Sequence, residues 1–387
     1  MLPPVTHVLY LSEKPGRNPI SGAESHVLTL VEELARAGAD TELLVMLWND
    51  GPLIRSRLAE AASSGVRIAL VPRPTGGTIP AGRYVRALVA WWRLFRALSK
   101  RRARIIHLHL DLIATIVCAR FAGCKHLVLS LHNDEQYFAT ARWHYWLRVI
   151  DRWIKAYIAI TGHVKAHYLM QSGVREDKIS VIHYGVPALR EASLPREKLG
   201  IPRNRFVIGF VGRLTKQKNI PLLLKAMMEL PEAFCIIIGD GEQRFELERL
   251  ANSLNLDNVR FAGAIADARR YMNAFDVFCL PSIWEGLGLV LVEAMHQGVP
   301  IAASRAGAIP EVLDDGRCGI LFDPYQPAAL VEAIRVIQRD PGETLRMTAR
   351  ALRRASEMFE VTAMVSKTLA VYRRILCETG PVHASEN

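Results

Sequence analysis

Residues 277–295 read Val277-Phe278-Cys279-Leu280-Pro281-Ser282-Ile283-Trp284-Glu285-Gly286-Leu287-Gly288-Leu289-Val290-Leu291-Val292-Glu293-Ala294-Met295. The first four residues are apolar and β-prone, which predicts a buried strand. The glycines that follow predict a turn, and the run after Gly288 predicts a helix that begins there. A strand that leads through a short turn into a helix is typical of a parallel α/β sheet.

The same alternation runs through the rest of the chain, which predicts parallel βαβ units with helices on both faces of the sheet. The pattern restarts near residue 205, after a segment, 185–202, that holds three prolines and is typical of a linker. The predicted strands are His7–Leu11, Thr41–Met46, Val66–Val71, Arg104–Leu110, Leu127–Leu131, Tyr157–Thr161, Arg205–Val211, Phe234–Ile238, Val259–Ala262, Val277–Leu280, Pro300–Ala303 and Gly319–Phe322.

We therefore predict an α/β protein with two doubly wound, Rossmann-like domains that face each other across a cleft. Residues 1–186 form the first domain and 187–361 the second, and a helix at about 362–380 is expected to pack back on the first. In open α/β sheets ligands bind at the carboxyl ends of the strands, so the cleft is the predicted site.

Composition narrows the classes of protein and of partner. A length of 387 residues is too great for one ordinary core, and a net charge of +11 favours anionic partners such as nucleic acid, an acidic membrane or a phosphorylated molecule. The six cysteines form no CxxC pair, which favours a reducing compartment and no metal framework. We see neither a signal peptide nor an apolar run long enough to span a bilayer. We therefore expect a cytoplasmic protein whose membrane contact, if any, is peripheral.

The turn before Gly288 combines backbone amides with two acids. Amides at a helix start are unpaired and carry partial positive charge, so those of Gly286, Gly288 and Leu289 suit a diphosphate or a polyhydroxyl ligand. Glu285 in the turn and Glu293 one turn inside the helix could accept hydrogen bonds from separate hydroxyls. Alternatively, both acids are simply solvated, as most carboxylates are.

A second group of candidates follows the strand that ends near Gly212. Arg213 and Lys218 lie in the next loop, where two cations could neutralise a diphosphate leaving group without a metal. The alternative is a basic surface loop.

The first half of the chain contributes weaker candidates. Gly22 precedes a predicted helix and would let the backbone approach a ligand closely. His132 follows a predicted strand, and His107 and His109 end the strand before it. A lone histidine is more often structural than catalytic, and all three could be packing residues.

Together these motifs resemble the retaining GT-B glycosyltransferases of family 4. The resemblance covers nearly the whole chain and is strongest over roughly 205–325. It rests on the E-x7-E pair Glu285 and Glu293, on Gly212, Arg213 and Lys218, on Gly239-Asp240-Gly241, on Gly298-Val299-Pro300, on Gly307-Ala308-Ile309-Pro310-Glu311, and on Gly316 and Gly319. Two residues depart from the family pattern: Asn219 replaces a common glycine, and Tyr184 replaces a common asparagine. Both departures put the local hinge geometry in doubt.

The resemblance implies roles for single residues. Glu285 would contact the donor sugar near its anomeric centre, Glu293 the ribose, and Arg213 and Lys218 the diphosphate. Backbone amides of Gly286, Gly288, Leu289 and Gly22 would approach sugar and phosphates, Ala264 and Ile265 the base, and His132 the donor sugar.

The resemblance also implies an activity. A sugar would pass from a UDP- or GDP-sugar to an acceptor hydroxyl with retention and without a cofactor. Because we see no HExxH, DxD-type or Cys/His metal cluster in the sequence, we also expect activity without a metal. The acceptor would be a lipid-linked or cell-surface glycan intermediate of polysaccharide or lipopolysaccharide synthesis. Two rivals are a nucleotide-sugar 2-epimerase of the same fold and, with no recognisable motif in its favour, a basic nucleic-acid-binding protein.

Residues 83–104 hold eight basic residues and no acidic one. The basic stripe consists of Arg83, Arg86, Arg93, Arg96 and Lys100, and the apolar stripe of Tyr84, Leu88, Trp91, Phe95 and Leu98. A second aromatic and basic cluster spans 142–155. These segments are either ordinary sheet-covering helices or a surface for the anionic inner face of the plasma membrane.

Overall fold

The computed structural model of the chain describes residues 4–12, 22–49, 51–72, 83–101, 103–109, 113–132, 141–187, 189, 194, 196–202, 204–265 and 267–377. The chain divides into two compact units. The first consists of the N-terminal part up to Gly185 together with the segment from Val361 onward, and the second runs from Val186 to Glu360.

The first unit is built on a parallel sheet of seven strands in the order β3-β2-β1-β4-β5-β6-β7. Its central strands are buried along their whole length, which explains their continuous apolar runs. The strands are β1 (Val5–Ser12), β2 (Thr41–Asn49), β3 (Arg67–Pro72), β4 (Ile105–Leu108), β5 (His126–Leu131), β6 (Ile154–Ala159) and β7 (Ile179–Val181).

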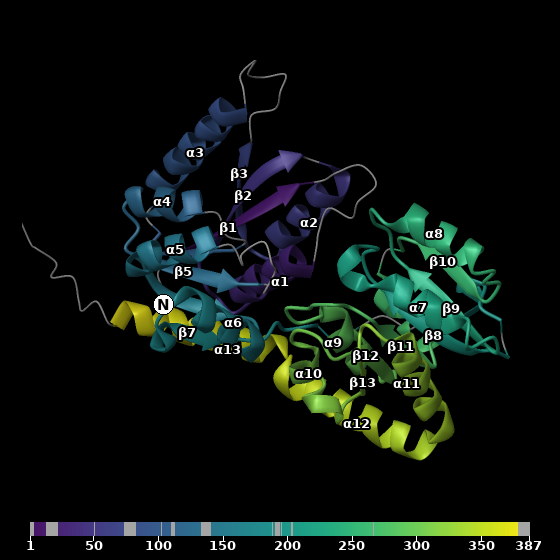
Figure 1. The fold of residues 1–387 in the computed structure, drawn as a ribbon. Coiled ribbons are helices and arrows are strands. Elements are labelled where there is room, and N and C mark those ends of the chain that lie inside the picture. Colours follow the sequence, from purple (N-terminus) through teal and green to yellow (C-terminus); the bar gives the residue numbers. More distant parts are fainter. Residues whose placement is uncertain are drawn as a thin grey trace, which may run out of the picture. The chain divides into compact units, whose positions relative to one another are not determined.

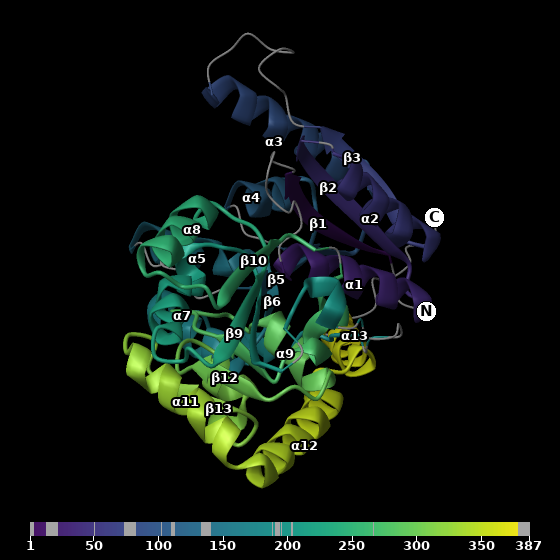
Figure 2. The same ribbon diagram turned by 90° about the vertical axis from the view of Figure 1, so that its right-hand side faces the viewer.

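Helices cover both faces of this sheet. On one face α1 contacts α2 and α13, and Figure 2 shows α2 alongside β2 and β3; on the other face α3, α4, α5 and α6 follow one another as neighbours. The helices are α1 (Gly22–Arg36), α2 (Pro52–Ser63), α3 (Arg83–Ser99), α4 (Ile113–Phe121), α5 (Ala141–Ile150), α6 (Gly162–Ser172) and α13 (Val361–Cys377).

The C-terminal helix α13 is part of the first unit, and its yellow ribbon lies among elements from the start of the chain (Figure 1). Tyr372 and Ile375 of this helix are fully buried and share one core with Val5 of β1 and Leu30 of α1. The last three residues of the range expected for this helix, 378–380, lie outside the described residues.

The second unit has a parallel sheet of six strands in the order β10-β9-β8-β11-β12-β13. The order reverses between β8 and β11, the two strands that start the two halves of the sheet. The strands are β8 (Phe206–Val211), β9 (Ala233–Ile238), β10 (Val259–Gly263), β11 (Val277–Leu280), β12 (Ile301–Ser304) and β13 (Ile320–Phe322).

Helices again lie on both faces, with α7 contacting α8 and α11, and α9 contacting α12. Helix α11 packs on β12 and β13 and buries Leu330, Val331, Ala333, Ile334 and Ile337 on one side. The helices are α7 (Ile220–Met227), α8 (Arg244–Ser253), α9 (Leu289–His296), α10 (Ile309–Val312), α11 (Pro327–Arg339) and α12 (Pro341–Met358).

Two doubly wound parallel sheets confirm the predicted fold class, and each predicted strand is found in a sheet, with Leu110 outside the described residues. The strand β7 was missed because its three residues at the sheet edge carry too short a pattern. Among the described residues, no helix is both long and apolar enough to cross a bilayer.

Candidate functional site

The candidate site of the second unit lies where its strands end. Because all six strands are parallel, the loops after them emerge at one edge of the sheet. The loop after β8 holds Arg213 and Lys218, and the loop after β11 holds Glu285. These loops flank the position where the strand order reverses, which is where open α/β sheets bind their ligands.

Glu285 and Lys218 are in direct contact. Lys218 Nζ donates to Glu285 Oε1 and forms an ion pair with it. The side chain of Lys218 is only 12% exposed and that of Glu285 only 7%. Ser282 Oγ donates to the same oxygen over 2.7 Å. Among the described residues this leaves Oε2 to accept from another group. The alternative of a solvated acid is therefore wrong for Glu285, and the alternative of a basic surface loop is wrong for Lys218.

The loops around Glu285 are tied to their neighbours through the backbone. The amide of Ile283 donates to Gln217 O, and Gln217 Nε2 donates to Trp284 O, both over 2.9 Å. Gly307 has a φ of +55°, and a Cβ there would lie 2.4 Å from Glu285 O, so no other residue fits without a shift. This explains a glycine of the 307–311 motif that the sequence alone could not interpret.

Helix α9 begins at Leu289 with Gly288 as its N-cap residue, as predicted. Gly288 has a φ of +78°, a left-handed conformation that glycine adopts without strain. Within the part of the chain that the structure describes, no side chain caps this helix start. The first amides of the helix therefore remain available to an anion, and the helix dipole adds partial positive charge at the same point.

Glu293 lies in the second turn of α9 and is partly exposed. Burial raises the pKa of its carboxyl from 4.5 to about 7, while the charge of Arg269 opposes this shift and that of Asp267 adds to it. Arg269 Nε also donates to Asp267 Oδ1 over 3.2 Å. The carboxyl is thus surrounded by groups that sequence reasoning did not single out, because their loop shows no motif.

The remaining candidates of this unit differ in exposure. Arg213 is exposed directly after β8, and Ala264 is exposed directly after β10, next to the half-buried Ile265. All three follow strand ends and so lie at the same edge of the sheet as Glu285.

Asn219, the first departure from the family pattern, leaves the local geometry intact. It has a φ of +50°, the conformation that makes glycine common there and that asparagine tolerates better than most residues. Its Nδ2 also donates to Pro324 O over 2.8 Å. The doubt about this turn is removed.

In the first unit, Gly22 is the first residue of α1 and is exposed. His132 follows β5 and is 6% exposed. Its Nδ1 is hydrogen-bonded to the hydroxyl of Tyr184, whose ring stacks on His26. Burial lowers the pKa of His132 to about 3, so the ring is neutral. Tyr184, the second departure, thus holds a candidate site residue, which only the structure reveals.

His107 and His109 do not have the same surroundings. His107 lies inside β4, with Nδ1 bonded to the Tyr372 hydroxyl over 2.7 Å and Nε2 bonded to Ser130 Oγ over 2.8 Å. His109 follows β4 and shares a hydrogen bond of 3.0 Å with His7. Burial lowers the pKa of each of these three histidines.

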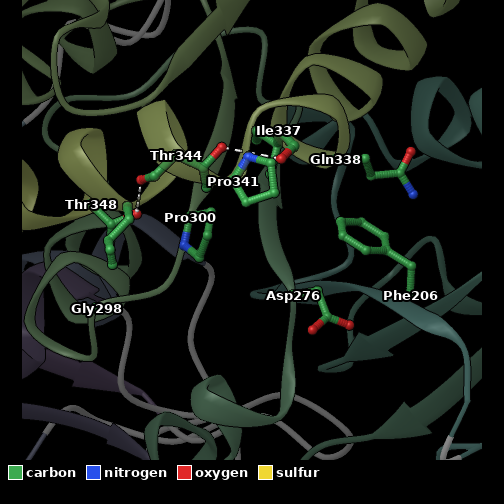
Figure 3. A pocket seen from close by; sticks show the side chains of 10 residues that line it. Phe206, Asp276, Gly298, Pro300, Ile337, Gln338, Pro341, Thr344 and Thr348 are labelled. Carbon is green, nitrogen blue, oxygen red and sulfur yellow. Dashed lines mark hydrogen bonds between the residues drawn. The ribbon is translucent and has the colours of Figure 1, made fainter.

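A separate hollow of about 520 Å³ lies at the opposite edge of the second sheet (Figure 3). Its lining includes Phe206, Asp276 and Pro300, which begin or precede β8, β11 and β12. The hydroxyls of Thr344 and Thr348 in its wall already donate to backbone carbonyls. We assign it no ligand.

Helix α3 does not bury its whole apolar stripe. Leu98 is buried and Phe95 half-buried, but Leu88 is 59% and Trp91 39% exposed. The buried face is formed by Ala90, Leu94 and Leu98, so the predicted apolar stripe overlaps with it only in part. The side chains of Arg83, Tyr84 and Arg86, and of 142–144 in the second cluster, lie outside the described residues.

Comparison with known families gives two matches. Residues 20–189 match "Glycosyltransferase Family 4" and residues 193–354 match "Glycosyl transferases group 1". The two matches correspond closely to the two sheets.

Curated relatives share one or both halves. The chain is 27% identical over 384 residues to the 2-deoxystreptamine glucosyltransferase of Streptomyces kanamyceticus. This match covers 90% of the chain and 98% of that enzyme. It is 30% identical over 237 residues, 55% of this chain, to the UDP-Gal:alpha-D-GlcNAc-diphosphoundecaprenol alpha-1,3-galactosyltransferase of Escherichia coli, and spans 60% of it. For three more relatives of 31–35% identity, the matched part spans only 33–49% of their length.

Among solved structures, HepE of Anabaena in complex with UDP matches with a TM-score of 0.78. The match covers 95% of this chain and 99% of that one at 22% identity. At this identity the likeness establishes the fold, with two Rossmann-like domains of the GT-B type.

Proposed function

We propose that the chain moves a sugar from a nucleotide diphosphate to an acceptor hydroxyl with retention at the anomeric carbon. It belongs to the glycosyltransferases, with a family 4 domain followed by a group 1 domain. The observation that carries the proposal is the buried contact of Lys218 with Glu285 beside the uncapped start of α9. One edge of one sheet thereby combines a cation, free amides and a carboxylate.

The donor would bind with its diphosphate at the cationic part of this edge. Charge develops on the diphosphate as the glycosidic bond to it breaks, so groups already aimed at that position lower the barrier. Lys218 Nζ, the guanidinium of Arg213 and the amides of Gly288 and Leu289 supply such groups. These fixed positive charges would perform the neutralisation that a divalent ion performs elsewhere, and transfer should therefore persist in a chelator.

The sugar and the ribose would be held by the two acids. Glu285 is kept in place by Ser282 and Lys218 through Oε1, so Oε2 is the atom we assign to a sugar hydroxyl near the anomeric centre. Glu293 would accept from the ribose hydroxyls, and Ala264 and Ile265 would contact the base. The complexes of HepE with UDP and UDP-glucose favour a UDP-sugar over a GDP-sugar as the first donor to test.

In the first unit, we propose that the free Nε2 of His132 accepts from, or donates to, a hydroxyl of the transferred sugar, and that the backbone at Gly22 approaches a phosphate. His132 Nε2 is buried and has no partner among the described residues, whereas Nδ1 is occupied by Tyr184.

Because the acceptor would attack from the face that the diphosphate leaves, the departing phosphate can take the acceptor proton.

We also propose that the first unit binds an anionic membrane surface and receives a lipid-linked glycan there, as a cytoplasmic, peripheral enzyme. Exposed aromatic and aliphatic side chains on neighbouring helices support this, namely Leu88 and Trp92 of α3, Phe121 of α4, and Tyr145 and Trp146 of α5. The guanidinium of Arg96 lies over the Trp92 ring at 4.9 Å. Apolar side chains mixed with arginines are typical of interfacial helices.

Co-sedimentation with vesicles tests the membrane surface. Wild type should pellet with vesicles rich in phosphatidylglycerol and stay in solution with phosphatidylcholine alone. The change Trp92→Ser should weaken pelleting, whereas Met170→Ser, at a 76% exposed residue of α6, should not. Pelleting that ignores both anionic lipid and Trp92 would exclude this surface.

Product analysis tests the transfer. Purified protein is incubated with UDP- and GDP-sugars, with and without lipid-linked saccharides, and the products are identified by NMR. We expect an acceptor-dependent product whose anomeric configuration equals that of the donor. An epimerised nucleotide sugar formed without acceptor would establish the epimerase instead, and an inverted product would refute retention.

A further inference from the structure

Three histidines meet on the α1/α13 face of the first sheet. His7 on β1 is paired in register with His107 on β4, and His109 lies two residues beyond His107. Residues i and i+2 of an extended segment point to the same side, and register partners on adjacent strands do so too. The three rings therefore converge from a rigid, fully parallel frame, and all are buried.

The spacing of their nitrogens is close to that of a tetrahedral site. One ring nitrogen from each residue lies within 4.8 Å of the other two. His7 Nδ1 and His109 Nε2 are 3.0 Å apart. Two imidazole nitrogens that each bind a tetrahedral Zn²⁺ at about 2.0–2.1 Å are separated by about 3.3 Å. Binding of one ion would require the rings to turn until all three nitrogens reach about that separation.

His7 and His109 each use only one ring nitrogen in the hydrogen bond that joins them. His7 Nε2 and His109 Nδ1 are buried and have no partner among the described residues. In a neutral ring one nitrogen carries a proton and the other a lone pair, so the pair always holds a buried group that is unsatisfied. Such a group costs about 1–3 kcal/mol. An ion held by His7 Nδ1 and His109 Nε2 would replace the proton that these two nitrogens share, and the far nitrogen of each ring would then carry the N–H.

The third ring has orienting partners. His107 is hydrogen-bonded to the Ser130 hydroxyl through Nε2 and to the Tyr372 hydroxyl through Nδ1. A metal-bound histidine normally donates its second N–H to a neighbouring oxygen, which fixes the ring and its tautomer. Whichever nitrogen binds the ion, the other keeps such an oxygen.

We propose that His7, His107 and His109 bind one first-row transition metal ion, with Zn²⁺ the best match. Imidazole suits zinc, and three histidines leave the fourth position open to water or hydroxide, which would balance part of the charge. The site would join β1 to β4 and, through Tyr372, to α13. The His109 ring lies 5.6 Å from the ring of His132, but the metal site does not depend on the proposed transfer chemistry.

Metal titration of protein without a histidine tag, stripped by a chelator, tests the proposal. Co²⁺ should bind at one equivalent per chain with the strong visible absorption of a tetrahedral ion, and Zn²⁺ should displace it and raise the unfolding temperature. Replacing both His7 and His109 by Gln should abolish all three effects. His296→Gln should abolish none of them; that residue is a partly buried histidine of the second unit whose Nε2 also lacks a partner among the described residues.

Two milder variants address the third ligand and keep the test open if the double variant does not fold. Ser130→Ala and Tyr372→Phe each remove one partner of His107. If His107 binds the ion through Nε2, Tyr372 supplies the orienting oxygen; if it binds through Nδ1, Ser130 does. The variant that loses this oxygen should bind the ion about 10–100-fold more weakly, and the other variant should bind it as tightly as wild type or more tightly. The pale spectrum of octahedral Co²⁺, binding that survives the double variant, or equal affinities in both milder variants would overturn the three-histidine site.

Discussion

Replacing Lys218 by Met should destabilise the second unit, because it leaves the carboxylate of Glu285 buried without its cation. The acid is only 7% exposed, so water can restore little of the lost interaction. Removing one partner of a buried ion pair costs about 3–5 kcal/mol. For a unit of this size, 1 kcal/mol corresponds to about 2–4 °C, so the unfolding temperature should fall by roughly 6–20 °C.

The double variant Lys218→Met with Glu285→Gln separates stability from catalysis. With both charges gone, the Ser282 hydroxyl still meets an oxygen of the new amide, and most of the lost stability should return. Transfer should not return, since the loss of one fixed charge at the leaving group costs about 100–1,000-fold in turnover. Thermal unfolding followed by circular dichroism and release of UDP from a donor measure the two effects.

The exposed pair of Arg244 and Glu248 on α8 is the matched control, because both side chains are more than a third exposed. Arg244→Met should change stability by less than about 1 kcal/mol. The reasoning fails if Lys218→Met unfolds like this control. It also fails if the double variant transfers sugar at the wild-type rate.

Three further predictions concern the close contact at Gly307, the raised pKa of Glu293 and the hydrogen bond of Tyr184. Gly307→Ala should displace the loop at Glu285 and reduce transfer at least about 10-fold, because its Cβ would meet a carbonyl oxygen at 2.4 Å in a strained backbone; normal kinetics would show that the loop is not constrained. Since the pKa of Glu293 is raised to about 7, the folded protein binds this proton more tightly than the unfolded chain does. The free energy of unfolding should therefore fall from pH 4.5 to 7, by up to about 3 kcal/mol. Glu293→Gln should flatten this dependence, and the donor KM of wild type should fall over the same rise in pH. Tyr184→Phe should leave His132 Nδ1 unpaired and lower kcat with little change in donor KM, whereas an equal loss in a variant at the exposed Tyr145 would indicate a general effect of losing a tyrosine hydroxyl.

The local strand–turn–helix pattern of 277–295 predicted its own structure well, because apolar runs and glycines act on neighbours in the chain. The same logic identified each long strand of both sheets. It failed for β7, whose three residues are too short a pattern to recognise and are held by pairing with β6. The apolar stripe of α3 coincides only in part with its buried face, since burial there is decided by packing against α4 and β3.

Contacts between residues far apart in the chain were beyond reach. The pairing of Lys218 with Glu285 spans 67 residues, and that of His132 with Tyr184 spans 52. Tyr184 was taken as a departure that disturbs a turn, whereas its hydroxyl holds a candidate site residue. His7 carried no motif of its own, and only the register of β1 with β4 brings it beside His107 and His109.

Calorimetric titration with UDP is the most direct test of the donor site at the edge of the second sheet. We predict one site per chain in the wild type, binding weakened at least about 10-fold in Lys218→Met and in Arg213→Ala, and unchanged binding in Arg244→Met. Equal affinities in all four proteins would contradict the assignment of this edge to the nucleotide sugar.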